Sequence, residues 1–303
     1  MIKRDARRQQ SKGFGLLVAA AIAYIFLTNW MELMRMAWPW YMQIKTDYQM
    51  NPVYHIALFT IPNHIINYTV ANLIMCVIYK SKLQIFESER SRGSSDEKWP
   101  WETMEPTEWN NLFWRSIKFT VFNSTVCNLI VNLIIANSGQ EVLNPTDIDK
   151  MPGPMLFAAQ IIFCMVVEDM VFFCSHRTLH HPILYPSVHK IHHEHKVTFS
   201  LAALHAHPLE YIMGNVLPVM VGPALLGPRM HLASMFGWYF LRSWESMDGH
   251  CGYSFSWSPF RLLPCQPEGN YHFFHHEENV GNYGSFFTWW DTIFGTNSAF
   301  YKQ

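Results

Sequence analysis

Long apolar segments dominate the pattern of this chain and predict helices that cross a membrane. Runs 14–30, 53–79, 117–136 and 155–174 each approach the roughly 20 residues that an α-helix needs to cross the hydrocarbon core. The first run follows a basic start, but the absence of a small-residue cleavage site favours a membrane helix over a signal peptide. Polar interruptions such as Asn128 indicate helices that pack on one another rather than standing alone in lipid.

A further apolar region covers residues 211–241 and is interrupted by a cluster of Gly and Pro at 222–228. The region is too short for two full crossings at roughly 20 residues each. A single crossing would place His250 and the later histidines on the opposite side from the earlier ones. We therefore expect a short re-entrant helical hairpin whose turn is the Gly–Pro cluster.

The distribution of Lys and Arg predicts which side of the membrane each segment faces. Basic residues gather in segment 3–12 and in a predicted cytosolic loop at about 80–116, whereas the intervening connections carry few. Four crossings then return the chain to the cytosol just before the histidine-rich part. The predicted fold is an all-α integral membrane protein with about four transmembrane helices, a short re-entrant helical hairpin and a cytosolic histidine-rich helical cap. We expect an N-terminal membrane region at 1–150 and a catalytic region at 151–303.

Composition agrees with a membrane protein and excludes several other classes. Hydrophobic residues make up 50% of the chain, and charged residues make up only 15%, against roughly 25% in a typical globular domain. The net charge of −1 gives no reason to expect a nucleic-acid partner. The six cysteines form no CxxC pair, so we expect isolated, mostly buried thiols rather than a disulfide framework.

Histidine is the residue type that indicates chemistry. The chain has 16 histidines, and 14 of them lie between His176 and His276. Spacings of three and four residues place imidazoles on one face of a helix. The clusters comprise His176 and His180; His189, His192 and His193; and His272, His275 and His276. A structural zinc site takes four ligands, so this larger number predicts two metal ions.

Other polar residues are candidates for supporting roles. His207 and His250 flank the predicted hairpin at its cytosolic mouth and are the natural additional ligands, although His205 competes with His207. Glu168 and Asp169 precede the first histidine pair by about two helical turns, where a carboxylate can fix the orientation of a ligand imidazole. The alternative for these two acids is a solvated helix end.

The absence of several known motifs excludes some classes of reaction. The sequence contains no HExxH zinc-protease motif, no GxSxG elbow and no phosphate-binding loop. A dinuclear histidine site beside lipid suits activation of O2 by iron, which can attack an unactivated C–H bond that side chains alone cannot. Zinc remains an alternative metal in the isolated protein, because imidazole binds both ions.

The histidine motifs resemble those of the membrane fatty acid hydroxylase/sterol desaturase superfamily. The pattern HxxxH, HxxHH and HxxHH occurs at 176–180, 189–193 and 272–276. Within this superfamily the chain is most similar to the C-4 methylsterol oxidases (sterol 4-alpha-methyl monooxygenases), through Ala-His-Pro-Leu-Glu at 206–210 and Gly-Asn-Tyr-Gly-Ser at 281–285.

The resemblance implies a set of residues and reaction components. It implies two Fe ions, O2 and electrons from NAD(P)H, delivered by a separate cytochrome b5 or reductase because this chain has no heme-binding signature. It also implies an endoplasmic reticulum membrane, with Asp291 as a further supporting carboxylate beside Glu168 and Asp169. The implied metal ligands are His176, His180, His189, His192, His193, His207, His250, His272, His275 and His276.

We therefore expect an O2-dependent di-iron monooxygenase that oxidises the C-4 methyl group of a sterol in sterol biosynthesis. Alternatives within the superfamily are a fatty acid or sphingolipid hydroxylase and a sterol desaturase. An alternative of a different class is a non-catalytic membrane protein that binds a metal or a sterol. O2-dependent and reductant-dependent product formation in isolated membranes would separate the enzymes from this last class.

Overall fold

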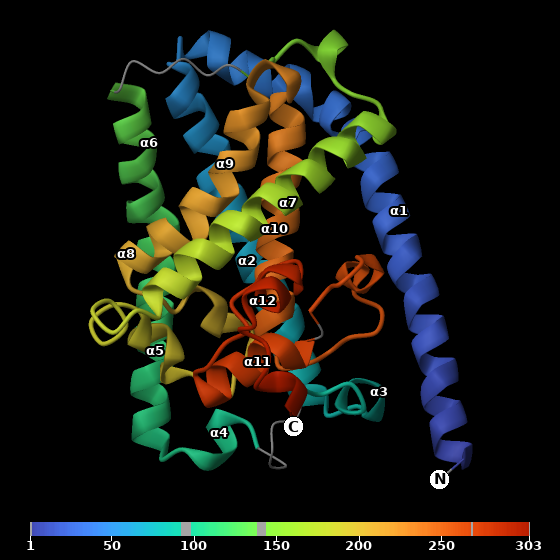
Figure 1. The fold of residues 1–303 in the computed structure, drawn as a ribbon. Helices are drawn as coiled ribbons and strands as arrows, with labels where there is room; N and C mark the ends of the chain where they lie inside the picture. Colours follow the sequence, from blue (N-terminus) through green and yellow to red (C-terminus); the bar gives the residue numbers. More distant parts are fainter. Residues whose placement is uncertain (1, 92–97, 138–143, 268, 303) are drawn as a thin grey trace.

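The computed structural model describes residues 2–91, 98–137, 144–267 and 269–302. Helices account for 75% of the structure, and the described residues contain no β-strand. The prediction of an all-α membrane protein is confirmed. Figure 1 shows the long helices running between two ends of the molecule, with both termini at the end that carries the histidines.

Each of the four predicted apolar runs lies in a long helix. The first lies in a single helix that rises along one edge of the molecule and then turns across its far end (Figure 1). The third is continuous through a π-helical turn. The helices are α1 (Ile2–Asp47), α2 (Pro52–Ser81), α5 (Pro106–Phe122) joined by η1 (Asn123–Cys127) to α6 (Asn128–Asn137), and α7 (Pro154–Leu179). Short helices α3 (Gln84–Glu87), α4 (Pro100–Thr103) and η2 (Ile148–Lys150) lie in the connections.

The predicted hairpin is present and extends further than expected. Its first arm is α8 (Pro208–Glu210), the π-helical turn η5 (Tyr211–Val216) and α9 (Leu217–Leu226). The turn contains η6 (Gly227–Arg229), where Gly227 has a φ of 47°, and the second arm is α10 (Leu232–His250). The arms continue beyond the apolar run because their polar residues are paired inside the protein, so hydropathy alone underestimates their length.

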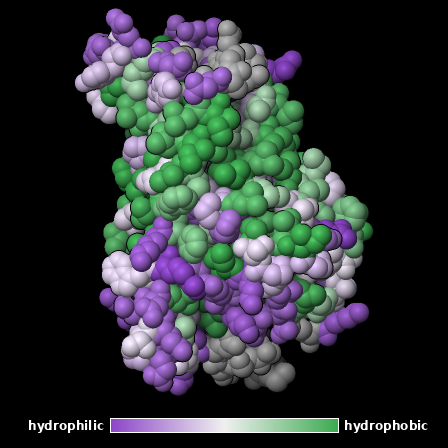
Figure 2. All heavy atoms as spheres, turned by 90° about the vertical axis from the view of Figure 1, so that its left-hand side faces the viewer, coloured by the Kyte–Doolittle hydropathy of each residue, from purple (hydrophilic) through white to green (hydrophobic). Residues whose placement is uncertain are grey.

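Among the residues that the structure describes, five segments are long and apolar enough to cross a membrane, including the first arm of the hairpin at Pro208–Arg229. Figure 2 shows a continuous hydrophobic belt between two more hydrophilic ends. The broader of these ends is the histidine-rich cap. The cap contains η3 (His189–Glu194), η4 (Ser200–Leu204), η7 (Pro259–Leu262), α11 (Gly269–Glu278), α12 (Trp289–Phe294) and η8 (Phe300–Lys302).

Close helix contacts align the belt with the cap. A Cβ atom at Gly222 on α9 would lie 3.0 Å from Cα of Cys164 on α7, so the glycine favours this close approach of the two helices. The indole of Trp30 on α1 donates a hydrogen bond to the carbonyl oxygen of Ala233 on α10, at 2.9 Å. These contacts join α7 to α9 and α1 to α10, and the ion pair between Glu168 and Arg242 joins α7 directly to α10; the lower ends of α7 and α10 carry His176 and His250.

Candidate metal centre

Nine buried or partly buried histidines converge in two groups at the junction between the helices and the cap. Within each group, the candidate ligand nitrogens all lie within 4.8 Å of one another. Helices α7, α10 and α11 and the 3-10 helix η3 supply all nine. Group A contains His176, His180, His189, His193 and His275, and group B contains His192, His250, His272 and His276.

The distances between imidazole nitrogens fit ligands that share an ion. In group A, the Nε2 atoms of His180 and His275 are 3.1 Å apart. In group B, Nε2 of His250 lies 3.2 Å from Nε2 of His192 and 2.9 Å from Nε2 of His272. Two nitrogens bound to one ion at about 2.0–2.1 Å would lie roughly 3 Å apart if their bonds met at a right angle.

In six of these histidines, the other ring nitrogen, Nδ1, lies within hydrogen-bond distance of an oxygen atom. Nδ1 of His189 donates to the Glu210 carboxylate at 2.8 Å, and the other five Nδ1 atoms face backbone carbonyl oxygens. A proton held on Nδ1 leaves the lone pair of Nε2 directed at the centre of the group, which is how proteins orient metal-binding imidazoles. The five carbonyl pairs are His176 with Tyr283, His192 with His205, His250 with Ser246, His275 with Gly281, and His276 with His195.

Each HxxHH triplet is divided between the two groups. His189 and His193 belong to group A, and His192 belongs to group B. In the third motif, His275 belongs to group A, whereas His272 and His276 belong to group B. The spacing of the triplets did not predict this division, in which residues at adjacent positions contribute to different groups. This interleaving holds the two groups side by side through the same short helices.

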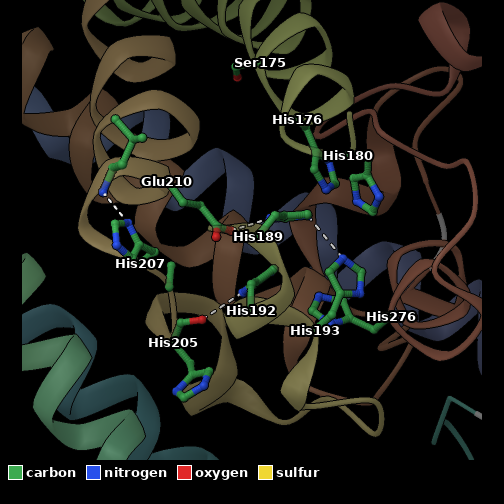
Figure 3. Close-up of polar contacts among 12 residues, drawn as sticks. Ser175, His176, His180, His189, His192, His193, His205, His207, Glu210 and His276 are labelled. Atoms are coloured by element: carbon green, nitrogen blue, oxygen red, sulfur yellow. Dashed lines mark hydrogen bonds and ion pairs between the residues drawn. The ribbon is translucent and has the colours of Figure 1, made fainter. Parts of the chain in front are cut away.

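His207 is the one predicted ligand that the structure places outside both groups. Its Nδ1 accepts a hydrogen bond from the backbone N–H of Leu209 at 3.1 Å and caps the start of α8. Figure 3 shows its ring directed at that helix and away from His176, His180 and His193. Its competitor His205 lies outside the groups as well, although its carbonyl oxygen accepts from His192.

The three predicted supporting carboxylates are buried, and a series of contacts connects Asp291 to a histidine through one intervening residue, Tyr283. Asp169 accepts hydrogen bonds from the backbone of Ser285 and Phe287 and from the Trp289 indole, which ties α7 to the C-terminal segment. Asp291 accepts from the N–H groups of Tyr283 and Gly284, and the carbonyl of Tyr283 in turn faces His176.

Glu168 pairs with Arg242 on α10 at 2.5 Å. Among the described residues, none of the three carboxylates hydrogen-bonds a histidine of either group.

Glu210 is the carboxylate that does contact a candidate ligand, and sequence reasoning assigned it no role. It follows His207 by three residues in the stretch 206–210, and that spacing brings it back toward His189 (Figure 3). The only sequence signal was its place in a motif that contains a histidine.

A second polar network that sequence reasoning missed supports group B. Ser116 on α5 is fully buried, and its hydroxyl lies 2.8 Å from Nε2 of His195 and 2.9 Å from Nδ1 of His205. The carbonyl groups of these same two residues accept from His276 and His192. Ser116 therefore fixes two backbone segments that orient ligands of group B, and no feature of the sequence linked residue 116 to the histidines.

Burial favours the neutral form of the candidate ligand imidazoles in the cap. Loss of solvation, followed by repulsion from neighbouring histidines, lowers the pKa of His180 to about 2 and that of His193 to about 3. The same causes hold the pKa values of His272, His275 and His276 well below their ordinary value. Neutral imidazole is the form that binds a metal ion.

The donor set fits two metal ions. Nine neutral nitrogen donors, six of them on rings held through Nδ1, form a preorganised site for a borderline metal such as Fe or Zn. Neither group contains a carboxylate or a cysteine. We expect the two ions to lie in the two groups.

Two cavities meet beside the histidines. A small one of about 70 Å³ is lined by His176, His189, His192, His250 and His272, among others. A larger one of about 370 Å³ lies among α1, α2, α6, α9 and α10, and its walls are mostly apolar. Asn215, Arg242 and Ser246 line both cavities. The larger volume lies in the ~300–1,000 Å³ range of small-molecule sites.

Comparison with known proteins supports the family that the histidine motifs indicated. Residues 161–296 match the fatty acid hydroxylase family. A putative methylsterol monooxygenase of Dictyostelium discoideum is 32% identical over 203 residues, which cover 66% of this chain and 73% of that protein. No solved structure matches the chain.

Two plant proteins match over shorter stretches. Methylsterol monooxygenase 2-2 of Arabidopsis thaliana is 41% identical over 153 residues, which cover 50% of this chain and 56% of that protein. A very-long-chain aldehyde decarbonylase of Oryza sativa subsp. indica is 38% identical over the same shares. The histidine motifs, the helical membrane fold and these relatives agree, and the chain belongs to the fatty acid hydroxylase/sterol desaturase superfamily.

Proposed function

We propose that this chain is an O2-dependent di-iron oxidase of a membrane lipid and that it oxidises the C-4 methyl group of a sterol. The observation that carries the proposal is the pair of buried histidine groups that opens onto an apolar cavity of ligand size. The names of the Dictyostelium and Arabidopsis relatives support the choice of a methylsterol.

The residues of groups A and B would hold the two iron ions, and His207 is left out of the proposed ligand set. Bound iron supplies the activation of O2 that oxidation of an unactivated C–H bond requires. The protein holds the imidazoles neutral, fixes their rings through Nδ1 and surrounds the reacting end of the lipid with buried side chains. Residues 151–303 would form the catalytic region, with residues 1–150 as its membrane support.

Electrons must come from outside the chain under this proposal. A separate cytochrome b5 or an NAD(P)H-linked reductase is the proposed donor, and the endoplasmic reticulum is the proposed membrane. The N-terminus and the cap would both face the cytosol, because they lie at the same end of the molecule (Figure 1) and the N-terminal segment is basic.

A second candidate is the processing of a long-chain lipid aldehyde or fatty acid. The rice relative named an aldehyde decarbonylase favours it, because its identity to this chain is close to that of the sterol-named relatives. Both functions would use the same histidine groups, so they differ only in the ligand of the larger cavity.

Lipid profiles of cells with and without the gene test the proposal by gas chromatography–mass spectrometry. Loss of the gene should cause 4-methyl or 4,4-dimethyl sterols to accumulate. Unchanged methylsterols together with a missing long-chain product would instead support the second candidate. An unchanged lipid profile would contradict both and favour a non-catalytic binding protein.

A further inference from the structure

The boundary between the two cavities contains polar side chains in an otherwise apolar passage. Asn215 and Ser246 line both the large chamber and the small cavity beside the histidines. In the part of the chain that the structure describes, neither side chain makes a hydrogen bond to protein. A polar group that lines a largely apolar cavity without a protein partner is suited to bind a polar group of the ligand.

Arg242 also lies at this boundary, but its charged guanidinium group is engaged by two carboxylates. Its Nε atom donates to Glu168 at 2.5 Å, and one of its terminal nitrogens pairs with Glu245 at 2.7 Å. These two ion pairs hold the guanidinium group in place as part of the cavity wall. Asn215 and Ser246 remain as the side chains available to a neutral hydroxyl group.

The local backbone brings both residues close to group B. Ser246 precedes His250 by one helical turn, and its carbonyl oxygen lies 2.7 Å from Nδ1 of that histidine. Asn215 lies in the π-helical turn η5, and such turns change the direction of side chains and occur often at functional sites. A hydroxyl group held between these residues would lie at the entrance to the small cavity.

We propose that Asn215 and Ser246 bind the hydroxyl group of a sterol and thereby present the neighbouring ring carbon to the histidine groups. The inference rests on the proposed function and adds the orientation of its substrate. In a sterol the hydroxyl-bearing carbon is bonded directly to C-4, so a hydroxyl at the boundary places the C-4 methyl group toward the small cavity. That cavity, at about 70 Å³, takes only the end of a ligand, and the rings and side chain occupy the large chamber.

Two other polar atoms in the chamber are poorer sites for this hydroxyl. The Tyr41 hydroxyl and Nε2 of His64 are buried without hydrogen-bond partners among the described residues. Both residues line only the large chamber and not the small cavity. A hydroxyl bound there would leave the neighbouring carbon inside the chamber and away from the metal ligands.

Binding affinity tests this inference independently of turnover. The full chain with its metals, in lipid nanodiscs, is titrated with a 4,4-dimethylsterol and with the methyl ether of the same sterol at its hydroxyl group. The wild-type protein should bind the free hydroxyl roughly tenfold more tightly, as expected for about one or two lost hydrogen bonds. Asn215→Leu and Ser246→Ala should each reduce this ratio, and the double variant should bring it close to one.

Matched controls lie outside both cavities. Asn29→Leu and Thr125→Val also remove polar groups, at positions whose side chains make only local hydrogen bonds, and they should keep the wild-type ratio. A wild-type protein with equal affinity for both sterols would overturn this inference alone. A double variant that binds with an unchanged ratio would also overturn it. A wild-type protein that binds neither sterol would overturn it together with the proposed function.

Discussion

The two nitrogens of each imidazole have separate tasks in this centre. In six of the nine histidines, Nδ1 is held by an oxygen of the protein, and Nε2 faces its group. The orientation of these six histidines therefore depends on a second residue, which for His176 and His276 is distant in sequence. The histidines could be predicted from their spacing, but partners such as Glu210 and the carbonyl of Tyr283 could not, because only the fold brings them close.

Replacement of one ligand of group B should remove one ion. We expect His192→Ala to retain membrane insertion, to lose one of two bound metals and to lose turnover by more than the roughly 10–100-fold that loss of an outer partner costs. Metal content and product formation measure both effects. His181→Ala is the matched control, because His181 is exposed and lies outside both groups. Full activity of His192→Ala would contradict the assignment.

Glu210 should increase the affinity of the site for its metal, because it orients the candidate ligand His189. Glu210→Gln keeps an oxygen that can accept from His189 but removes the negative charge, so we expect metal affinity to fall about tenfold, at the low end of the range for such partners. Competition with a chelator measures the affinity. Glu278→Gln changes an exposed residue in the same way and should leave the affinity unchanged. An unaltered affinity in Glu210→Gln would show that the charge plays no part.

Among the elements, the apolar runs predicted the helices well and the hairpin only in outline. The four long runs correspond to α1, α2, α5–α6 and α7 because roughly 20 apolar residues leave few alternatives in a membrane. The hairpin is longer than predicted because α10 continues through Arg242 and Glu245, whose charges are paired in the interior. The π-helical turns η1 and η5 have no sequence signature that a periodicity analysis detects.

The crossing of α7 and α9 should depend on the absence of a side chain at position 222. Gly222→Ala would place a methyl group 3.0 Å from Cα of Cys164, so the neighbouring backbone of α7 must give by a few tenths of an ångström. We expect a loss of about 1–3 kcal/mol in the free energy of unfolding, as for other overpacked cores. Unfolding midpoints in detergent measure the loss. Gly13→Ala has open space around its new methyl group and should show no loss. Equal midpoints for Gly222→Ala and wild type would contradict the prediction.

For the whole molecule, the sequence predicted that all histidine motifs lie at one end, and the structure places them there. The division of the triplets into two interleaved groups could not be predicted, since it depends on how η3 and α11 face each other. The Lys and Arg bias further predicts that this end faces the cytosol.

Accessibility of cysteines in sealed microsomes tests the orientation. Cys265 is exposed in the cap between η7 and α11, so a membrane-impermeant maleimide should label it without detergent. Asp149→Cys in a Cys265→Ser background introduces a thiol in η2, at the opposite end of the molecule (Figure 1), and this thiol should react only after permeabilisation. Cys265→Ser is the control for the cap signal. The reverse pattern of labelling would place the cap in the lumen.

The metal content of the purified, reconstituted protein tests the central claim most directly. Two spatially separate histidine groups predict two iron ions per chain after anaerobic loading, measured by mass spectrometry of the metal against protein concentration. A single ion per chain, or none, would contradict the account of a two-metal oxidase.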